Sequence, residues 1–105
     1  MTPHREVFSR LVAELTGLME EIAARRSHAS LEVDRRLGFL DNSASLFAVK
    51  DWPGLLAAND EGITQWHVET AEMMVELANH ALAILRGPTP PPPHAQAMAV
   101  GARGR

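Results

Sequence analysis

The side chains best suited to chemistry lie together in the second half of the chain. Glu72, Glu76 and His80 follow one another at intervals of four, so they would share one face of a helix. His67 and Glu69 lie close by in the sequence. Helical bundles bind pairs of metal ions through such groups, using Glu-x-x-His motifs on two facing helices. A metal centre is therefore the first chemistry to test against the sequence.

The spacing differs from that of such metal sites. The motif here is Glu-x-x-x-His, it occurs once, and the first half of the chain contains no matching set. A solvated acidic helix face explains these residues better. There is no cysteine and no glycine-rich phosphate loop, so thiol chemistry and nucleotide binding have no sequence support. The remaining histidines and the serines are scattered and form no recognisable triad: His4, His28, His94, Ser27, Ser30, Ser43 and Ser45. We expect a non-enzymatic protein without cofactor or metal.

Composition points to a small helical protein. The 105 residues allow one domain, 46% of them are hydrophobic, and only 5% are aromatic. No apolar run approaches the ~18 residues of a membrane span, and the N-terminus has no apolar signal region, so we expect a cytoplasmic protein. Residues 51–86 contain six acids against a single Arg86, which argues against nucleic-acid binding: Asp51, Asp60, Glu61, Glu69, Glu72 and Glu76.

Apolar residues in steps of four and three predict two long amphipathic helices, close to a coiled-coil heptad pattern. The first is expected over about residues 3–49, with Gly17, Gly38 and residues 41–45 as its weak points. The second is expected over about residues 53–86, ending at Arg86-Gly87-Pro88. The cluster at 59–62 leaves a second helix start open, with 53–58 as a separate short helix, but the unbroken 4-3 register favours one bent helix. The first seam contains Phe8, Val12, Leu15, Met19, Ile22, Arg26, Ala29, Val33, Leu37, Leu40, Ala44 and Phe47. The second contains Trp52, Leu56, Asn59, Ile63, Trp66, Thr70, Met73, Leu77, His80 and Ile84, flanked by Leu55, Met74, Leu82 and Leu85.

Residues 50–54 are expected to form the corner between the two helices. Asp51 suits a helix N-cap, Pro53 suits a first turn, and proline disfavours helical backbone at Trp52. A short corner predicts an all-α fold built as a long antiparallel helical hairpin. The apolar stripes are wider than two helices can bury, so the hairpin is expected to assemble into a dimeric or tetrameric bundle. Residues 87–105, with five prolines among the first seven, are expected to form a disordered tail.

The two tryptophans lie fourteen residues apart, which is two heptads, and they share one face of the predicted second helix. They are either core anchors or part of a binding surface. The expected apolar interaction face consists of Phe8, Leu15, Ile22, Phe47, Trp52, Leu56, Ile63, Trp66, Met73, Leu77 and Ile84. The surplus apolar surface must contact another protomer, a partner protein or a hydrophobic phase.

Residues 40–86 resemble the phasins, small helical proteins that coat polyhydroxyalkanoate granules in bacteria. The likeness consists of an Ala/Ser/Leu-rich helix end, a corner with Lys50-Asp51 and Leu55-Leu56, and then Trp66 and Glu76-Leu77-Ala78. The Trp-Pro-Gly triplet at 52–54 and the short chain depart from the family pattern. The resemblance implies amphipathic helices that rest on the polyester surface of a granule.

A protein–protein interaction module is the alternative that the sequence leaves open. In this case a helical homo-oligomer would dock a partner helix and act as an adaptor or regulator. It would account equally well for the acidic second half of the chain.

Overall fold

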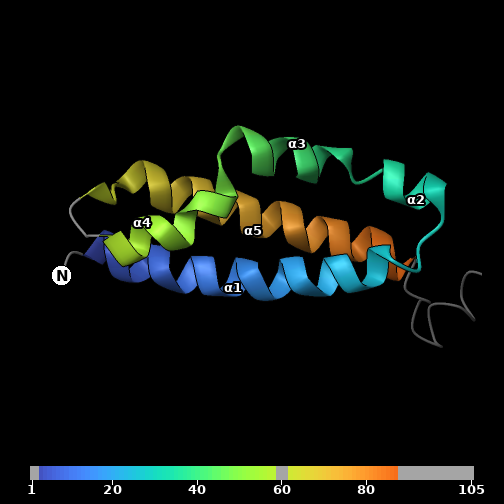
Figure 1. Cartoon of the computed structure of the whole chain (residues 1–105), viewed down its shortest axis with the longest axis horizontal. Coiled ribbons are helices and arrows are strands. Elements are labelled where there is room, and N and C mark those ends of the chain that lie inside the picture. Colours follow the sequence, from blue (N-terminus) through green and yellow to red (C-terminus); the bar gives the residue numbers. More distant parts are fainter. Residues whose placement is uncertain (1–2, 59–61, 88–105) are drawn as a thin grey trace, which may run out of the picture.

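The computed structural model describes residues 3–58 and 62–87, and this part of the chain is helical and contains no strand (Figure 1). The all-α prediction is thereby confirmed for the described residues. The elements are α1 (Pro3–Arg26), α2 (Leu31–Arg35), α3 (Gly38–Leu46), a 3-10 helix η1 (Val49–Asp51), α4 (Trp52–Ala58) and α5 (Gln65–Arg86). The predicted N-cap Thr2 and the predicted tail, apart from Gly87, lie outside the described residues.

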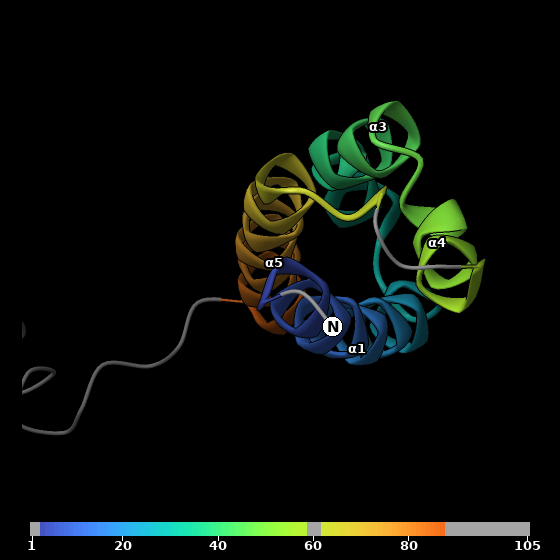
Figure 2. The ribbon, with the colours of Figure 1, turned by 90° about the vertical axis from the view of Figure 1, so that its left-hand side faces the viewer.

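The two long helices, α1 and α5, pack side by side and run in the same direction (Figure 1). Near their N-terminal ends the rings of Phe8 and His67 lie 5.5 Å apart. Near their C-terminal ends Arg86 Nη2 donates a hydrogen bond to Glu21 Oε2 over 2.8 Å. The intervening elements α2 to α4 return in the opposite direction, with α3 against α5 and α4 against α1 (Figure 2). The predicted antiparallel hairpin is therefore wrong, because the chain makes three passes instead of two.

The predicted helix over residues 3–49 is divided by a break at residues 27–30, and again at residues 36–37 and 47–48. Ser30 has extended backbone, and its hydroxyl oxygen accepts a hydrogen bond from the N–H of Val33 over 3.1 Å. This N-cap starts α2 and allows the chain to reverse direction after the basic last turn of α1. Gly17, one of the expected weak points, lies inside an intact α1, whereas Gly38 is the first residue of α3.

The corner follows an unusual residue, Ala48, whose φ of 51° and ψ of 46° place it in the left-handed region. The chain then passes through η1 directly into α4. Trp52 has helical backbone, with φ −61° and ψ −41°, although Pro53 was expected to disfavour it. Two features of the structure explain this. The indole is buried and donates from Nε1 to the carbonyl of Phe47 over 3.2 Å, and Pro53 lies in a first turn, where no N–H is needed.

The predicted helix over residues 53–86 is also divided, into α4 and α5. Thr64 and His67 form a capping box at the start of α5, in which the N–H of Thr64 donates to His67 Nδ1 over 3.1 Å. The core between the helices is apolar apart from Thr70: Phe8, Val12, Leu15, Ile22, Leu37, Leu40, Trp52, Ile63, Val68, Thr70, Ala71, Met74, Val75, Ala78, Ala81 and Leu82 are buried. Three of the buried α5 residues are alanines, which let neighbouring helices approach closely.

The left-handed backbone at Ala48 generates a stability prediction. A left-handed conformation costs an L-residue roughly 1–2 kcal/mol, and glycine adopts it freely at an entropic cost of about 0.5–1 kcal/mol. We expect Ala48→Gly to raise the free energy of unfolding by about 0.5 kcal/mol. Ala13→Gly, at an exposed position inside α1, is the control and should lower it by about 1 kcal/mol. Urea denaturation measures both. Equal losses for the two variants would contradict the prediction.

The capping box generates a second stability prediction. A glutamine at position 67 can still accept a hydrogen bond from the N–H of Thr64, as in other capping boxes, whereas a leucine cannot. Both replacements remove the ring contacts of His67 with Phe8 and Trp66. We therefore expect His67→Leu to be less stable than His67→Gln by about 1 kcal/mol in thermal or urea unfolding. A leucine variant as stable as the glutamine variant would show that the cap contributes nothing.

Candidate functional site: an apolar stripe on the outside of α5

The expected interaction face is divided between the core and the surface. Five of its members, Phe8, Leu15, Ile22, Trp52 and Ile63, are buried in the core. Four others are half-buried: Phe47, Leu56, Leu77 and Ile84. Trp66 and Met73 are exposed, with 54% and 37% of their surfaces accessible. The two tryptophans therefore have different surroundings, because Trp52 anchors the core and Trp66 lies at the surface.

Helix α5 carries two adjoining apolar faces. Its core face contains Ala71, Met74, Ala78 and Leu82, all buried. At 100° per residue, a second face is centred about a third of a turn around the helix and contains Trp66, Met73, Leu77 and Ile84; we call these four residues the outer stripe. The 4-3 spacing in the sequence identified the outer stripe, and Met74 and Leu82, which were expected only to flank it, form the core. The period of an apolar pattern cannot tell which of two stripes meets the rest of the chain.

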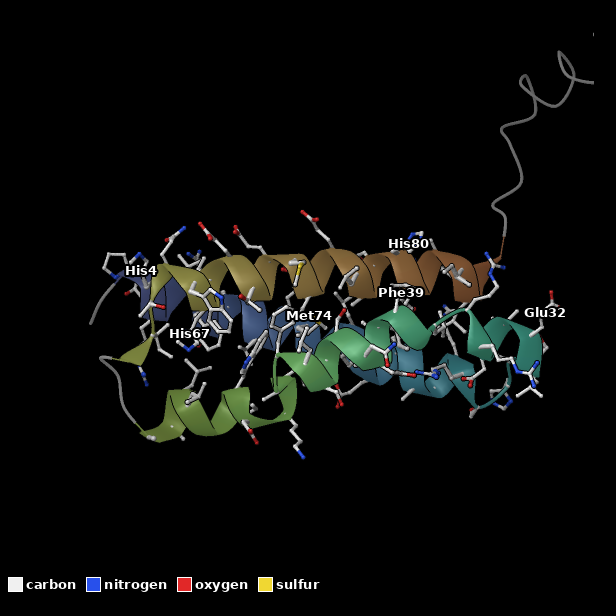
Figure 3. The ribbon with its side chains drawn as sticks, turned by 90° about the horizontal axis from the view of Figure 1, so that it is seen from above. His4, Glu32, Phe39, His67, Met74 and His80 are labelled. Carbon is white, nitrogen blue, oxygen red and sulfur yellow. The ribbon has the colours of Figure 1, made fainter. Side chains whose placement is uncertain are left out.

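Helix α3 borders the outer stripe. The ring of Phe39 on α3 lies 5.3 Å from the ring of His80 on α5, with 52° between the ring planes; both residues are labelled in Figure 3. At the other end of α3, the rings of Phe47 and Trp66 lie 6.2 Å apart. Leu46, at the end of α3, is 76% exposed. Short α3 therefore covers the stripe only in part and adds an exposed leucine beside it.

The acidic residues that first suggested a metal site lie on the solvent face of α5. Glu69, Glu72 and Glu76 are exposed and occupy the sector of the helix opposite the core face. Within the described residues, no three histidine, cysteine or acidic side chains gather in a way that could hold a metal ion. His80 contacts Phe39, and the nitrogen of His67 belongs to the capping box. The carboxylates thus form an acidic ridge along α5, next to the outer stripe.

A groove lies on the other side of the molecule, between α1 and the α3–η1–α4 corner. It has a volume of about 640 Å³, within the size range of ligand pockets. Leu15 and Met19 lie along one wall, and Ala44, Ala48 and Val49 lie along the other. The remaining lining residues are Val12, Thr16, Glu20, Ala23, Asp41, Ser45, Lys50, Trp52 and Pro53. Three alanines are among the lining residues. The groove was not predicted, because residues 3–49 were expected to form one continuous helix.

An ion-pair cluster holds α2 and α3 to the end of α1. Arg26 donates to Asp34 Oδ1 over 2.7 Å, and to both carboxylate oxygens of Asp41 over 2.7 and 3.0 Å. Hydrogen bonds from Arg26 lower the pKa of Asp34, and those to Asp41 and Asp34 raise the pKa of Arg26. We call Arg26, Asp34 and Asp41 the clamp. Since Asp41 also lines the groove, the clamp fixes one end of it.

No protein-family profile, curated protein or solved structure matches this chain. Among the described residues, no helix is long and apolar enough to cross a membrane. The chemistry of the exposed surface must therefore support any functional conclusion.

The clamp generates a prediction about acid stability. The folded pKa of Asp34 lies below its unfolded value of about 3.9. The clamp therefore contributes its full stability above that unfolded pKa, and loses it as the pH falls through the lower folded pKa. We expect the urea midpoint to fall between about pH 5 and pH 2, and to fall less steeply in Arg26→Gln. Arg10→Gln, at an exposed position of α1, should keep the slope of the unmodified protein. Identical slopes for Arg26→Gln and the unmodified protein would contradict this account.

Proposed function

We propose that the protein is a non-enzymatic, phasin-like binding protein that attaches to the hydrophobic polymer of polyhydroxyalkanoate granules through the outer stripe. The observation that carries the proposal is the exposure of Trp66, Met73 and Leu46 on adjoining helices. Large apolar side chains gathered on one exposed face indicate an interaction surface. Attachment to a polymer requires apolar area and little side-chain specificity, which suits a stripe without any convergent polar groups.

Two of the positions that carry the phasin resemblance belong to this surface. Trp66 and Leu77 are both members of the outer stripe, three turns apart along α5. Leu55 is also exposed but lies on α4, which packs against α1. Burying the accessible part of Trp66 alone, about 100 Å², would contribute about 2–3 kcal/mol to attachment. Several such residues together would hold the protein on a polymer surface.

Docking of a partner helix is the alternative function, and two observations favour it. The outer stripe keeps the 4-3 spacing through which helices interlock, and the groove beside α1 has walls with many apolar residues. Self-association into a dimer or tetramer would use the same surfaces. Sedimentation velocity across a concentration series, with the unmodified protein and Ala44→Phe, which fills the groove, would identify this mode by a change in mass.

The polymer proposal predicts the effect of a charge placed in the stripe. Trp66→Glu removes the largest exposed apolar side chain and adds a charge, so we expect co-sedimentation with polyhydroxyalkanoate particles to weaken by at least tenfold. Leu31→Glu is the matched control, because Leu31 is 66% exposed but belongs to α2, away from α5. It should bind within about twofold of the unmodified protein.

Circular dichroism should report equal helix content for both variants, since both positions are exposed. Equal binding by Trp66→Glu and the unmodified protein would refute the outer stripe as the attachment surface. Absence of any binding to the particles by the unmodified protein would refute the proposed function itself.

A further inference from the structure

The outer stripe has an asymmetric charge environment. Glu69, Glu72 and Glu76 lie along its open flank and are exposed. Helix α5 contains one lysine or arginine, Arg86, which lies in the last turn and is paired with Glu21 of α1. On α3, Asp41 is paired with Arg26 in the clamp and lines the groove, so it adds no free charge to the stripe. The open flank of the stripe is therefore the negatively charged one.

The three ridge carboxylates are not neutralised within the described part of the chain. None of them forms an ion pair there, and Glu69 is bound only by the amide of Gln65, over 3.0 Å. Because the ridge lies next to the stripe on α5, any surface that contacts Trp66 and Met73 also comes close to these carboxylates. At that distance charges interact strongly, since the Debye length is about 8–10 Å at physiological salt.

We propose that the acidic ridge selects the surface to which the outer stripe attaches: uncharged hydrophobic polymer is accepted, and anionic lipid is rejected. This inference rests on the proposed function and adds the chemical class of the surface. Each basic residue near an anionic membrane raises the affinity of a protein for that membrane roughly fivefold. Each carboxylate should therefore lower the affinity by a similar factor. Three carboxylates together should weaken attachment to an anionic surface by about a hundredfold.

The ridge also argues against an antiparallel second copy of the chain as the occupant of the stripe. In an antiparallel pair of α5 helices, equivalent flanks face each other, so the two acidic ridges would repel. An uncharged surface avoids this repulsion.

The test uses polyhydroxyalkanoate particles in three forms: bare, coated with anionic phosphatidylglycerol, and coated with a cationic lipid. Binding is measured by co-sedimentation at pH 8, where unperturbed histidines are uncharged. We expect bare particles to be bound about a hundredfold more strongly than anionic ones, with cationic particles bound at least as strongly as bare ones. At 1 M salt, where the Debye length is about 3 Å, the difference should largely disappear.

A triple variant isolates the ridge. It combines Glu69→Gln, Glu72→Gln and Glu76→Gln. We expect its binding to bare particles to be unchanged, and its binding to anionic particles to rise to within about fivefold of its binding to bare ones. The control variant Glu6→Gln, Glu14→Gln, Glu32→Gln removes the same charge from exposed positions on α1 and α2, and should keep the discrimination. Circular dichroism checks that both variants fold.

The outcomes separate the two proposals. Binding of the unmodified protein to bare and anionic particles with similar strength would overturn the ridge as a selector and leave the proposed function intact. Discrimination that persists in the ridge variant, or disappears equally in the control, would also overturn it. Failure to bind bare particles would overturn the proposed function.

Discussion

The parallel packing of α1 against α5 is the constraint on which the rest of the structure depends. Parallel neighbours cannot be joined by a short turn, because the end of the first helix and the start of the second lie at opposite ends of the pair. Helix α1 has 24 residues and is about 36 Å long, so residues 27–64 must return over that length. The return requires a reversal at each end. An N-terminal cap starts the helix that follows each reversal: Ser30 for α2 and the Thr64–His67 box for α5. The breaks in the two predicted helices follow from this connection.

The sequence predicted the helical class and much of the α1 core face, because Phe8, Leu15 and Ile22 repeat at helical spacing beside charged residues. It did not predict the number of passes. The 4-3 series continued through residues 27–30, since apolar periodicity measures position around a helix and does not detect a change of direction. Ser30, two residues before an acidic residue, was the local signal that reasoning from periodicity overlooked. Ala48 gave no signal, because left-handed backbone is unusual for alanine.

The candidate site was predicted as a set of residues but not as a surface. Trp66, Met73, Leu77 and Ile84 were recognised as one stripe, and the need for a further contact was inferred from the width of the apolar face. Which stripe would meet the rest of the chain depends on α1, which is separated from α5 by residues 27–64. Alanines of α5 lie on the face that meets α1, together with Met74 and Leu82, whereas Trp66 and Met73 remain exposed. The ridge of Glu69, Glu72 and Glu76 then distinguishes this outside face from an ordinary hydrophobic patch, because it adds charge discrimination to apolar attraction.

The different surroundings of the two tryptophans provide the most direct measurement of the central claim, that an intact bundle attaches through the outer stripe. A Trp52→Phe variant reports Trp66 alone, and a Trp66→Phe variant reports Trp52 alone. In solution, Trp66 should emit as an exposed indole and be quenched readily by acrylamide, whereas Trp52 should be protected. On polyhydroxyalkanoate particles the emission of Trp66 should shift to the blue, and acrylamide should no longer quench it readily. The emission of Trp52 should stay unchanged. A Trp66 already protected in solution, or a Trp52 that becomes exposed on the particles, would contradict the account.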